Sequence, residues 1–248
     1  MCPTPVLLSD DVIRVYYAGV TEEMVGRIGY VDLDAKNPKN VLADPENPVF
    51  DIGARGHFDD NGVVPISIVK RKEGLFLYYI GFQLGTKIRY LIFSGLATSD
   101  ENGEHFTRYS DVPVLDRSQE GTLLRSAPCV LPDEAGGYHL WYIAGSEHID
   151  VDGKEIPTYQ VRYTHSDDGK KWPSEGRLVI DFKNDDEYGF GRPHVVKGTK
   201  GYHMWCSLRR KSIPYQLGYA SSPDGINWTR DDKKIGLTVS DEGWDSEM

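Results

Sequence analysis

The chain has 248 residues, a length that suits one large all-β domain or two ordinary domains and can bury a sizeable core. Its 28 basic and 38 acidic residues give a net charge of −10, which argues against nucleic acid as the main partner. Three cysteines and a start without a basic stretch and apolar run favour a reduced, cytoplasmic protein without a signal peptide; no apolar run reaches the ~18 residues of a membrane span.

A short apolar sequence motif that contains a proline occurs four times along the chain. The prolines are Pro5, Pro65, Pro128 and Pro193, spaced 60, 63 and 65 residues apart. Two more sequence motifs follow each proline in the same order. The first is rich in aromatic residues, and the second is of the type SGLATSD. Three features in one order indicate a single supersecondary unit copied four times.

Each copy is predicted to contain four short strands. In the second copy these are VVPISIVKR (63–71), LFLYYIGF (75–82), IRYLIFSGLATS (88–99) and TRYSDVPVL (107–115). They are rich in β-branched and aromatic residues and are separated by turn residues. Repeated four-stranded antiparallel units of this length predict an all-β fold, a β-propeller in which the first strand of each blade lines a central channel.

The predicted blades follow one another through a single propeller domain covering residues 1–248. Their approximate limits are 1–52, 53–117, 118–183 and 184–240. Residues 241–248 are expected to begin a fifth blade, so the sequence predicts a five-bladed propeller whose last blade is incomplete in this chain. Exposed blade edges would then allow self-association.

The turns between third and fourth strands share their own motif. SDDGKKW at 166–172 and SPDGINW at 222–228 place Asp and Gly in a tight turn, with an aromatic residue three positions after the glycine. Aspartate caps such turns and glycine permits positive φ, so we interpret these carboxylates as structural.

Several motifs together resemble a known family. They are FDDNGVVP (58–65), LYYIGF (77–82), GLATSD (95–100), the paired turns, DDEYGFGRP (185–193) and GWDSEM (243–248). The set is similar to bacterial five-bladed propeller proteins related to glycoside hydrolase families 43, 32 and 68, of the arabinanase, invertase and levansucrase type, found among surface-polysaccharide enzymes. Members commonly carry more chain at both ends. The resemblance implies a glycosidase or transglycosidase with a carbohydrate ligand.

In that superfamily the substrate lies at one channel mouth, near the starts of the first strands, and the ends of the second strands return there. Glycoside hydrolysis requires an acid and a nucleophile or base. The candidates are Asp60 paired with Glu247 or with Glu147. The relatives also place an acid before the proline of the third catalytic blade, where this chain has Arg125-Ser126-Ala127, so the identity of the acid stays open.

Other polar residues are expected to bind the substrate at the same mouth. They are Asp59, Asn61, Gln83, Arg125, Ser126, His148, Arg192, His194 and Arg209. Planar guanidinium groups suit carboxylate or phosphate, so the arginines, with Arg210, suggest an anionic sugar.

Structural alternatives remain open for many of these candidates. Asp59 and Asp60 can cap a turn, Arg125 and Arg192 can form ion pairs, Glu147 and His148 can be solvated loop residues, and Glu247 is terminal.

Two function classes follow from this pattern. The first is a glycoside hydrolase or transglycosidase; the alternative is a noncatalytic carbohydrate-binding or polysaccharide-assembly propeller. The histidines show no HxH or HExxH spacing, so we predict no metal and no cofactor. The expected partner is a carbohydrate, with no nucleic acid and no membrane span.

Overall fold

A computed structural model describes residues 2–45, 48–213, 215–236, 240–243 and 246. These residues form β-strands and one short 3-10 helix, and they contain no α-helix. They divide into two compact units. The first comprises Met1–Asp116, Pro132–Gly137 and Asp167–Trp172; the second comprises Arg117–Leu131, Tyr138–Ser166 and Pro173–Met248.

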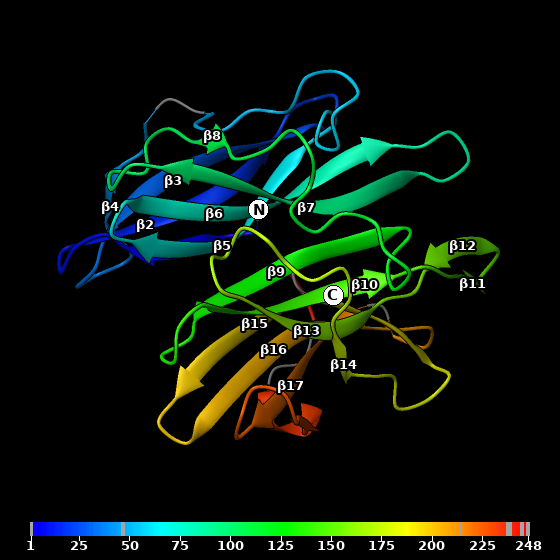
Figure 1. The fold of residues 1–248 in the computed structure, drawn as a ribbon. Helices are drawn as coiled ribbons and strands as arrows, with labels where there is room; N and C mark the ends of the chain where they lie inside the picture. Colours follow the sequence, from blue (N-terminus) through cyan, green and yellow to red (C-terminus); the bar gives the residue numbers. More distant parts are fainter. Residues whose placement is uncertain (1, 46–47, 214, 237–239, 244–245, 247–248) are drawn as a thin grey trace. The chain divides into compact units, whose positions relative to one another are not determined.

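The first unit holds two four-stranded antiparallel arrays, blue and cyan to green in Figure 1. The first array runs in the order β1 (Thr4–Leu7), β2 (Val12–Val20), β3 (Gly26–Asp34) and β4 (Val41–Ala43). The second contains β5 (Val63–Arg71), β6 (Gly74–Leu84), β7 (Tyr90–Ser99) and β8 (Thr107–Arg108), paired in that order.

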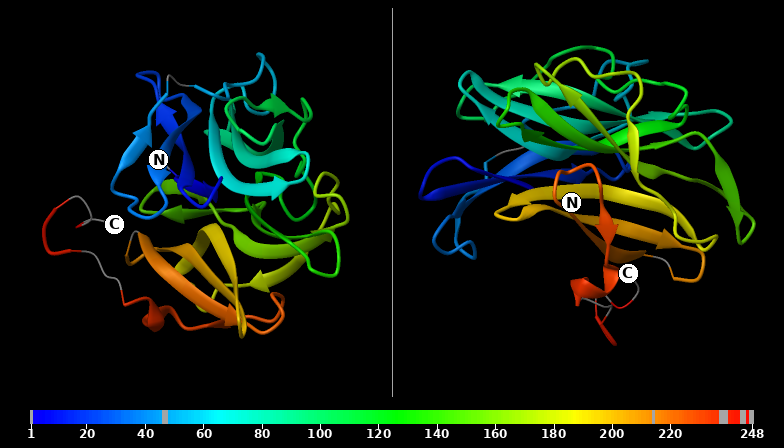
Figure 2. Two further views of the ribbon diagram at one scale, coloured as in Figure 1. Left: turned by 90° about the vertical axis from the view of Figure 1, so that its left-hand side faces the viewer. Right: turned by 60° about the horizontal axis from the view of Figure 1, so that its bottom comes forward.

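The second unit also holds two four-stranded arrays. One contains β9 (Leu124–Pro132), β10 (Tyr138–Gly145), β13 (Gln160–Ser166) and β14 (Arg177–Ile180), with a separate hairpin of β11 (His148–Val151) and β12 (Lys154–Pro157). The other contains β15 (Glu187–Gly198), β16 (Gly201–Arg210), β17 (Tyr215–Ser222) and β18 (Thr229–Arg230), followed by the 3-10 helix η1 (Asp232–Ile235). This last sheet is yellow to red in Figure 2.

The four arrays confirm the sequence-based prediction of an all-β chain built from antiparallel four-stranded repeats, because each array falls within one predicted blade. The blade count, the closure of a propeller and the single domain over residues 1–248 stay predictions. The expected fifth strand falls on residues 241–248, of which 244, 245, 247 and 248 lie outside the described residues.

Aromatic side chains of the second strands fill the cores. Tyr16 on β2, Tyr78 on β6 and Trp141 on β10 are each 0–1% exposed. Burying a large aromatic side chain removes 150–250 Å² from water, so residues of this size dominate the stability of a small sheet array.

The same three aromatic residues each donate a hydrogen bond to a turn glycine in the following repeat. Tyr16 Oη bonds Gly103 O, Tyr78 Oη bonds Gly169 O, and Trp141 Nε1 bonds Gly225 O, each at 2.7 Å. The three glycines have φ of +65°, +70° and +75°. A buried N–H or O–H needs an acceptor, and these bonds satisfy it while joining successive repeats.

The aspartates of these turns have the structural role that the sequence suggested. Asp168 Oδ1 accepts hydrogen bonds from the backbone N–H groups of Lys170 and Lys171 at 2.8 and 2.9 Å. Asp224 Oδ1 accepts from Ile226 and Asn227 at 2.9 and 2.8 Å. These bonds hold the turn that presents each glycine carbonyl to the aromatic donor.

Candidate functional site

A buried carboxylate lies shortly before the first strand of the second repeat. The side chain of Asp59 is 0% exposed, and its Oδ2 accepts hydrogen bonds from Arg108 Nε at 2.8 Å and from Tyr79 Oη at 3.0 Å. Burial, followed by the charge of Asp59, raises the pKa of Tyr79, so its hydroxyl stays a donor. Asp59 is thus held by an arginine from the outermost strand of the same repeat.

The fourth repeat contains an equivalent pair. Glu187, at the start of β15, has a fully buried side chain that accepts hydrogen bonds from Arg230 Nη1 and Nη2 at 2.8 and 2.9 Å. Burial alone would raise the pKa of Glu187, but the bonds from Arg230 and from the backbone of Lys183 lower it to about 2. Glu187 is therefore ionised at neutral pH, which suits an electrostatic role and excludes that of a proton donor.

The third repeat buries Glu120 at the corresponding place, shortly before its first strand β9. Its side chain is 4% exposed and pairs with Arg125 Nε and Arg162 Nη1, both at 3.1 Å; Tyr142 Oη also donates to it. Arg125 is thus already engaged by a carboxylate of the same unit. A role of Arg125 in ligand binding stays a prediction, and the ion-pair alternative accounts for its present contacts.

These three buried acid–arginine pairs, Asp59–Arg108, Glu120–Arg125 and Glu187–Arg230, occur in successive repeats. Because the arrangement recurs near the start of the first strand in three of the four repeats, it favours a structural role for Asp59 over the substrate-binding role predicted for it. Sequence reasoning missed Glu120, Glu187 and Arg230. The signal was present: a Thr-Arg pair follows the turn aromatic in both the second and the fourth repeat.

Asp60, Asn61 and Gln83 lie together at one end of β5 and β6. Asp60 Oδ2 accepts a hydrogen bond from the backbone N–H of Gly56 at 2.8 Å, and Gln83 Nε2 donates to Gly56 O at 3.3 Å. The backbone N–H of Asn61 donates to Phe82 O at 3.0 Å. The start of a first strand and the end of a second strand therefore meet here, as the sequence predicted, and Asp60 is partly exposed.

Asp60 also caps the turn that precedes β5, which is the structural alternative that the sequence left open for this residue. The capping bond uses one carboxylate oxygen, and the Asp60 side chain is partly exposed. Catalysis by Asp60 stays a prediction.

Backbone strain marks the first strands β9 and β15 of the second unit. Ala127 and Arg192 have φ of +51° and +44°, and each directly precedes the proline of its strand. Left-handed backbone is costly for residues other than glycine, and such strain concentrates at functional sites. The backbone N–H of Val195 donates to Cys129 Sγ at 3.2 Å, so the two strained segments lie on neighbouring strands.

Ser126 and His194 belong to the same two segments. Ser126 is 2% exposed, and its Oγ is buried without a hydrogen-bond partner among the described residues. Desolvation, with the nearby charge of Arg192, lowers the pKa of His194 and favours a neutral imidazole. Burial raises the pKa of Cys129 to about 11, which excludes a thiolate nucleophile at neutral pH. Arg192 and His194 are thus close to each other, and the bond from Val195 N to Cys129 Sγ links their strand to the strand of Ser126.

The other predicted catalytic carboxylates are placed differently. Glu147 is exposed, and its backbone oxygen accepts from Thr158 N at 2.9 Å beside the β11–β12 hairpin. His148 is exposed on the same hairpin opposite Pro157. This placement matches the solvated-loop alternative. Glu247 lies outside the described residues.

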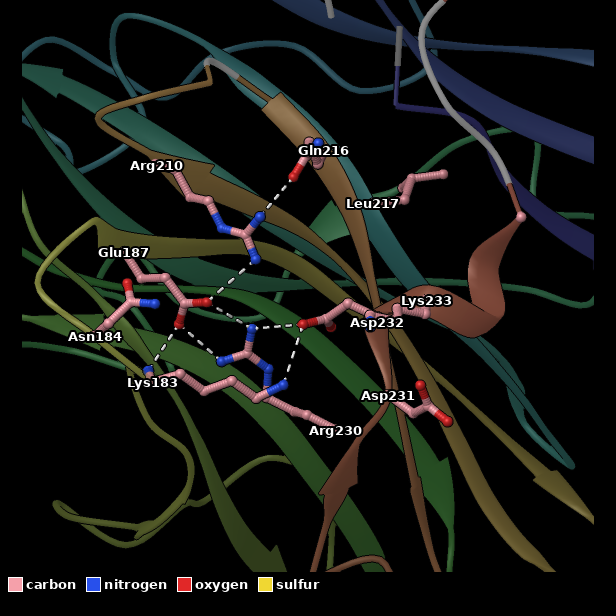
Figure 3. Close-up of a pocket in the computed structure, with 11 residues that line it drawn as sticks. Lys183, Asn184, Glu187, Arg210, Gln216, Leu217, Arg230, Asp231, Asp232 and Lys233 are labelled. Atoms are coloured by element: carbon pink, nitrogen blue, oxygen red, sulfur yellow. Dashed lines mark hydrogen bonds and ion pairs between the residues drawn. The ribbon is translucent and has the colours of Figure 1, made fainter.

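A charged cavity of about 550 Å³ opens at the start of β15 and the end of β16 (Figure 3). Its lining residues all belong to the second unit: Lys183, Asn184, Glu187, Arg210, Gln216, Leu217, Arg230, Asp231, Asp232, Lys233 and Gly236. Glu187 lies between Arg210 and Arg230 in Figure 3, and Arg230 also bonds Asp232 at 2.9 Å. The cavity has a size common for small-molecule sites, but its central charges already neutralise one another.

Arg209 and Arg210 are neighbours in β16 with different contacts. Arg210 reaches Gln216 Oε1 at 2.8 Å and Glu187 Oε1 at 3.4 Å. Arg209 Nη1 donates to Tyr159 Oη at 2.8 Å. Successive strand residues face opposite sides of a sheet, so Arg210 lines the cavity and Arg209 does not.

The described ranges hold neither a metal-binding cluster nor a membrane-spanning helix. No group of three or more His, Cys, Asp and Glu side chains among them has an arrangement that could hold a metal ion. No helix there has the length and apolar character needed to cross a membrane.

No protein-family profile matches the chain. Uncharacterized protein Rv1502 of Mycobacterium tuberculosis (strain ATCC 25618 / H37Rv) is 34% identical over 246 residues, covering 99% of this chain and 80% of that protein. A solved structure described as a glycoside hydrolase has a TM-score of 0.73 at 20% identity, covering 99% of this chain and 76% of that one. A thermostable family-43 glycoside hydrolase has a TM-score of 0.65 at 15% identity, covering 96% and 72%.

These structural similarities establish the class of fold, which the chain shares with these two solved structures. In sequence, the chain belongs to the same family as Rv1502 of Mycobacterium tuberculosis.

Proposed function

We propose that this protein is a carbohydrate-active protein that acts on a sugar or oligosaccharide as a glycoside hydrolase or transglycosidase. The fold shared with glycoside hydrolases supports the substrate class, although a fold alone does not carry an activity. The finer architecture that we propose with it is a five-bladed propeller.

The proposal rests on two strand segments of the second unit that combine strained backbone with a buried hydroxyl lacking a hydrogen-bond partner among the described residues. Ala127 and Arg192 hold positive φ, and Ser126 buries a hydroxyl without a partner among the described residues. Each feature costs folding free energy, and such costs persist where a ligand uses them. In the proposed reaction, Asp60 is the principal carboxylate and acts as nucleophile or base.

A second candidate is a noncatalytic carbohydrate-binding or assembly protein. The buried acid–arginine pairs favour it, because a carboxylate held in an ion pair is not available for catalysis. Among the predicted catalytic carboxylates in the described part of the chain, Asp60 and the exposed Glu147 remain available. Arg125 occupies the segment where the resembled hydrolases place an acid, and it is bound to Glu120.

The test is a glycan array followed by turnover assays on each bound glycan, with wild type and Asp60→Asn. If Asp60 is catalytic, Asp60→Asn should lower turnover by roughly 100-fold or more while binding persists. Asp10→Asn, which removes an exposed carboxylate in the turn between β1 and β2, is the matched control and should leave turnover unchanged.

Binding by the wild type without turnover on any bound glycan would favour the noncatalytic candidate. The absence of binding to every glycan on the array would overturn the proposal.

A further inference from the structure

The arginines considered as ligand-binding residues differ in how their charges are balanced. Arg125 pairs with Glu120 at 3.1 Å, and Arg210 approaches Glu187 at 3.4 Å. Arg209 forms no ion pair with a carboxylate in the described part of the chain; its one hydrogen bond goes to Tyr159 Oη. A guanidinium has five N–H donors, so most of the donors of Arg209 are unused.

Three tyrosine rings surround the Arg209 guanidinium. Its Cζ lies 4.8 Å from the ring centroid of Tyr188, 5.2 Å from Tyr215 and 5.9 Å from Tyr159. Tyr188 and Tyr159 are 5% and 8% exposed, whereas Tyr215 is 43% exposed. The cation therefore lies against two buried rings and one ring that borders solvent, which gives a ligand an approach beside Tyr215.

Arg209 is half-buried, so its uncompensated charge is partly removed from water. Arg209 Nε is buried without a hydrogen-bond partner among the described residues. Desolvation works against the charged form, but the neighbouring tyrosine oxygens raise the pKa of Arg209, so it stays protonated. Proteins normally pair a buried charge, because an unpaired one costs several kcal/mol. Ring faces offset part of that cost and leave the charge available to an anion.

The surrounding backbone preserves this arrangement. Gly189 lies opposite Arg209 in the β15–β16 ladder, and a Cβ at Gly189 would come within 3.0 Å of the Tyr159 ring. Tyr159 N and O bond Tyr188 O and Phe190 N at 3.3 and 3.2 Å, which fixes the ring that holds Arg209.

We propose that Arg209, framed by Tyr159, Tyr188 and Tyr215, binds a carboxylate group of the carbohydrate ligand, so that the protein prefers uronic acids to the corresponding neutral sugars. The inference rests on the proposed function and specifies its substrate class. A guanidinium edge matches a carboxylate in two parallel hydrogen bonds, and an exposed tyrosine face offers stacking to a sugar ring. In the cavity that Arg210 lines, Arg210 and Arg230 both pair with Glu187.

The test uses matched pairs of sugars on one array: glucuronate and glucose, galacturonate and galactose, mannuronate and mannose, and glucose 6-phosphate. Calorimetric titration then measures the dissociation constants of the best-bound pair for wild type and variants. We expect wild type to bind the uronate at least tenfold more tightly than the neutral sugar. Arg209→Gln should remove that preference while neutral-sugar binding stays within about twofold of wild type.

Two further variants separate charge, geometry and folding. Arg209→Lys keeps the charge but loses the planar donor pair, so its preference should be intermediate. Arg89→Gln removes an exposed arginine that lies over the Tyr90 ring at 5.5 Å and should change nothing. Thermal unfolding of every variant checks that the fold is retained. If Arg209→Gln does not fold, the inference is tested on Arg209→Lys and Tyr215→Ala, each of which should lower the preference for uronate below that of wild type.

The outcomes are distinguishable. Equal binding of uronate and neutral sugar, unchanged in Arg209→Gln, would overturn the inference and leave the proposed function intact. Tighter binding of the phosphate sugar than of every uronate would overturn the carboxylate assignment. Failure of every sugar to bind would overturn the inference and the proposed function together.

Discussion

Glu187 is a residue whose ionisation links stability to pH. Its pKa is about 2 in the folded protein against an ordinary value of 4.5. The stabilisation is therefore complete above pH 4.5 and is lost as the pH falls towards 2. A difference of this size corresponds to about 3 kcal/mol.

We expect Glu187→Gln to lower the free energy of unfolding by about 3 kcal/mol at pH 7, since it removes the buried carboxylate that accepts two bonds from Arg230 and leaves Asp232 as the ion-pair partner of Arg230. The loss should shrink between pH 4.5 and pH 2. Urea denaturation at pH 7, 4.5 and 3 measures both effects. Asp231→Asn, which removes the partly exposed partner of Lys234, is the control and should cost less than ~1 kcal/mol. Equal losses at pH 7 and pH 3 would contradict the assignment.

Ser126 offers a second prediction at this scale, in which stability and binding change in opposite directions. Its hydroxyl is buried without a partner among the described residues, so Ser126→Ala should leave the free energy of unfolding unchanged or raise it by up to ~1 kcal/mol. Sugar affinity should fall if the hydroxyl awaits a ligand. Thermal unfolding and calorimetric titration on the same preparation compare the two. A destabilised protein with unchanged affinity would show that the hydroxyl has a structural role.

At the scale of the elements, the hydrogen bonds between aromatic residues and turn glycines join successive repeats. A Cβ added to Gly225 would lie 2.9 Å from the Trp141 ring, at a position where φ is +75°. Gly225→Ala is therefore expected to cost about 2–3 kcal/mol, combining backbone strain with a displaced indole.

Gly136→Ala separates the two causes, because Gly136 has φ of +114° but open space around a Cβ. It should show the conformational cost without the steric one, and so a smaller loss in thermal unfolding. Trp141→Phe should cost about 1–2 kcal/mol, since it removes one of two indole donors to Gly225 O, the other being Trp228 Nε1 at 2.9 Å, and leaves the buried site underfilled. Equal losses for both glycine variants would remove the role assigned to the close contact.

At the scale of the whole molecule, one face of the β15–β17 sheet exposes apolar side chains. Val196, Trp205 and Leu217 are 43%, 37% and 45% exposed. Trp205 lies opposite Tyr219, and Val196 opposite His203, so these side chains share one face. Contiguous apolar surface promotes association.

We therefore expect this chain to self-associate with rising concentration. Sedimentation velocity across a hundredfold concentration range measures it, and Val196→Lys combined with Leu217→Lys should suppress it. Met24→Lys changes a 77% exposed side chain outside this sheet and should not. Identical sedimentation of the double variant and wild type would argue against this face.

Much of the architecture could be predicted because it is repeated. Pro65, Pro128 and Pro193 mark three of the first strands, and the Asp-Gly turns mark the connections, so local turn chemistry and strand propensity agreed with the fold. The site was harder, because charge pairing depends on contacts between distant residues. Nothing local in Glu120 or Arg162 indicates that they meet, and only their burial in three dimensions distinguishes a structural carboxylate from a reactive one.

The buried indole of Trp141 also provides an optical signal for folding. Trp141 is 0% exposed and donates its N–H to Gly225 O, whereas Trp205, at the matching position of the next repeat, is 37% exposed. Iodide should therefore quench the emission of a variant that keeps only Trp205 and spare one that keeps only Trp141. Loss of that contrast during denaturation would report separation of the third and fourth repeats.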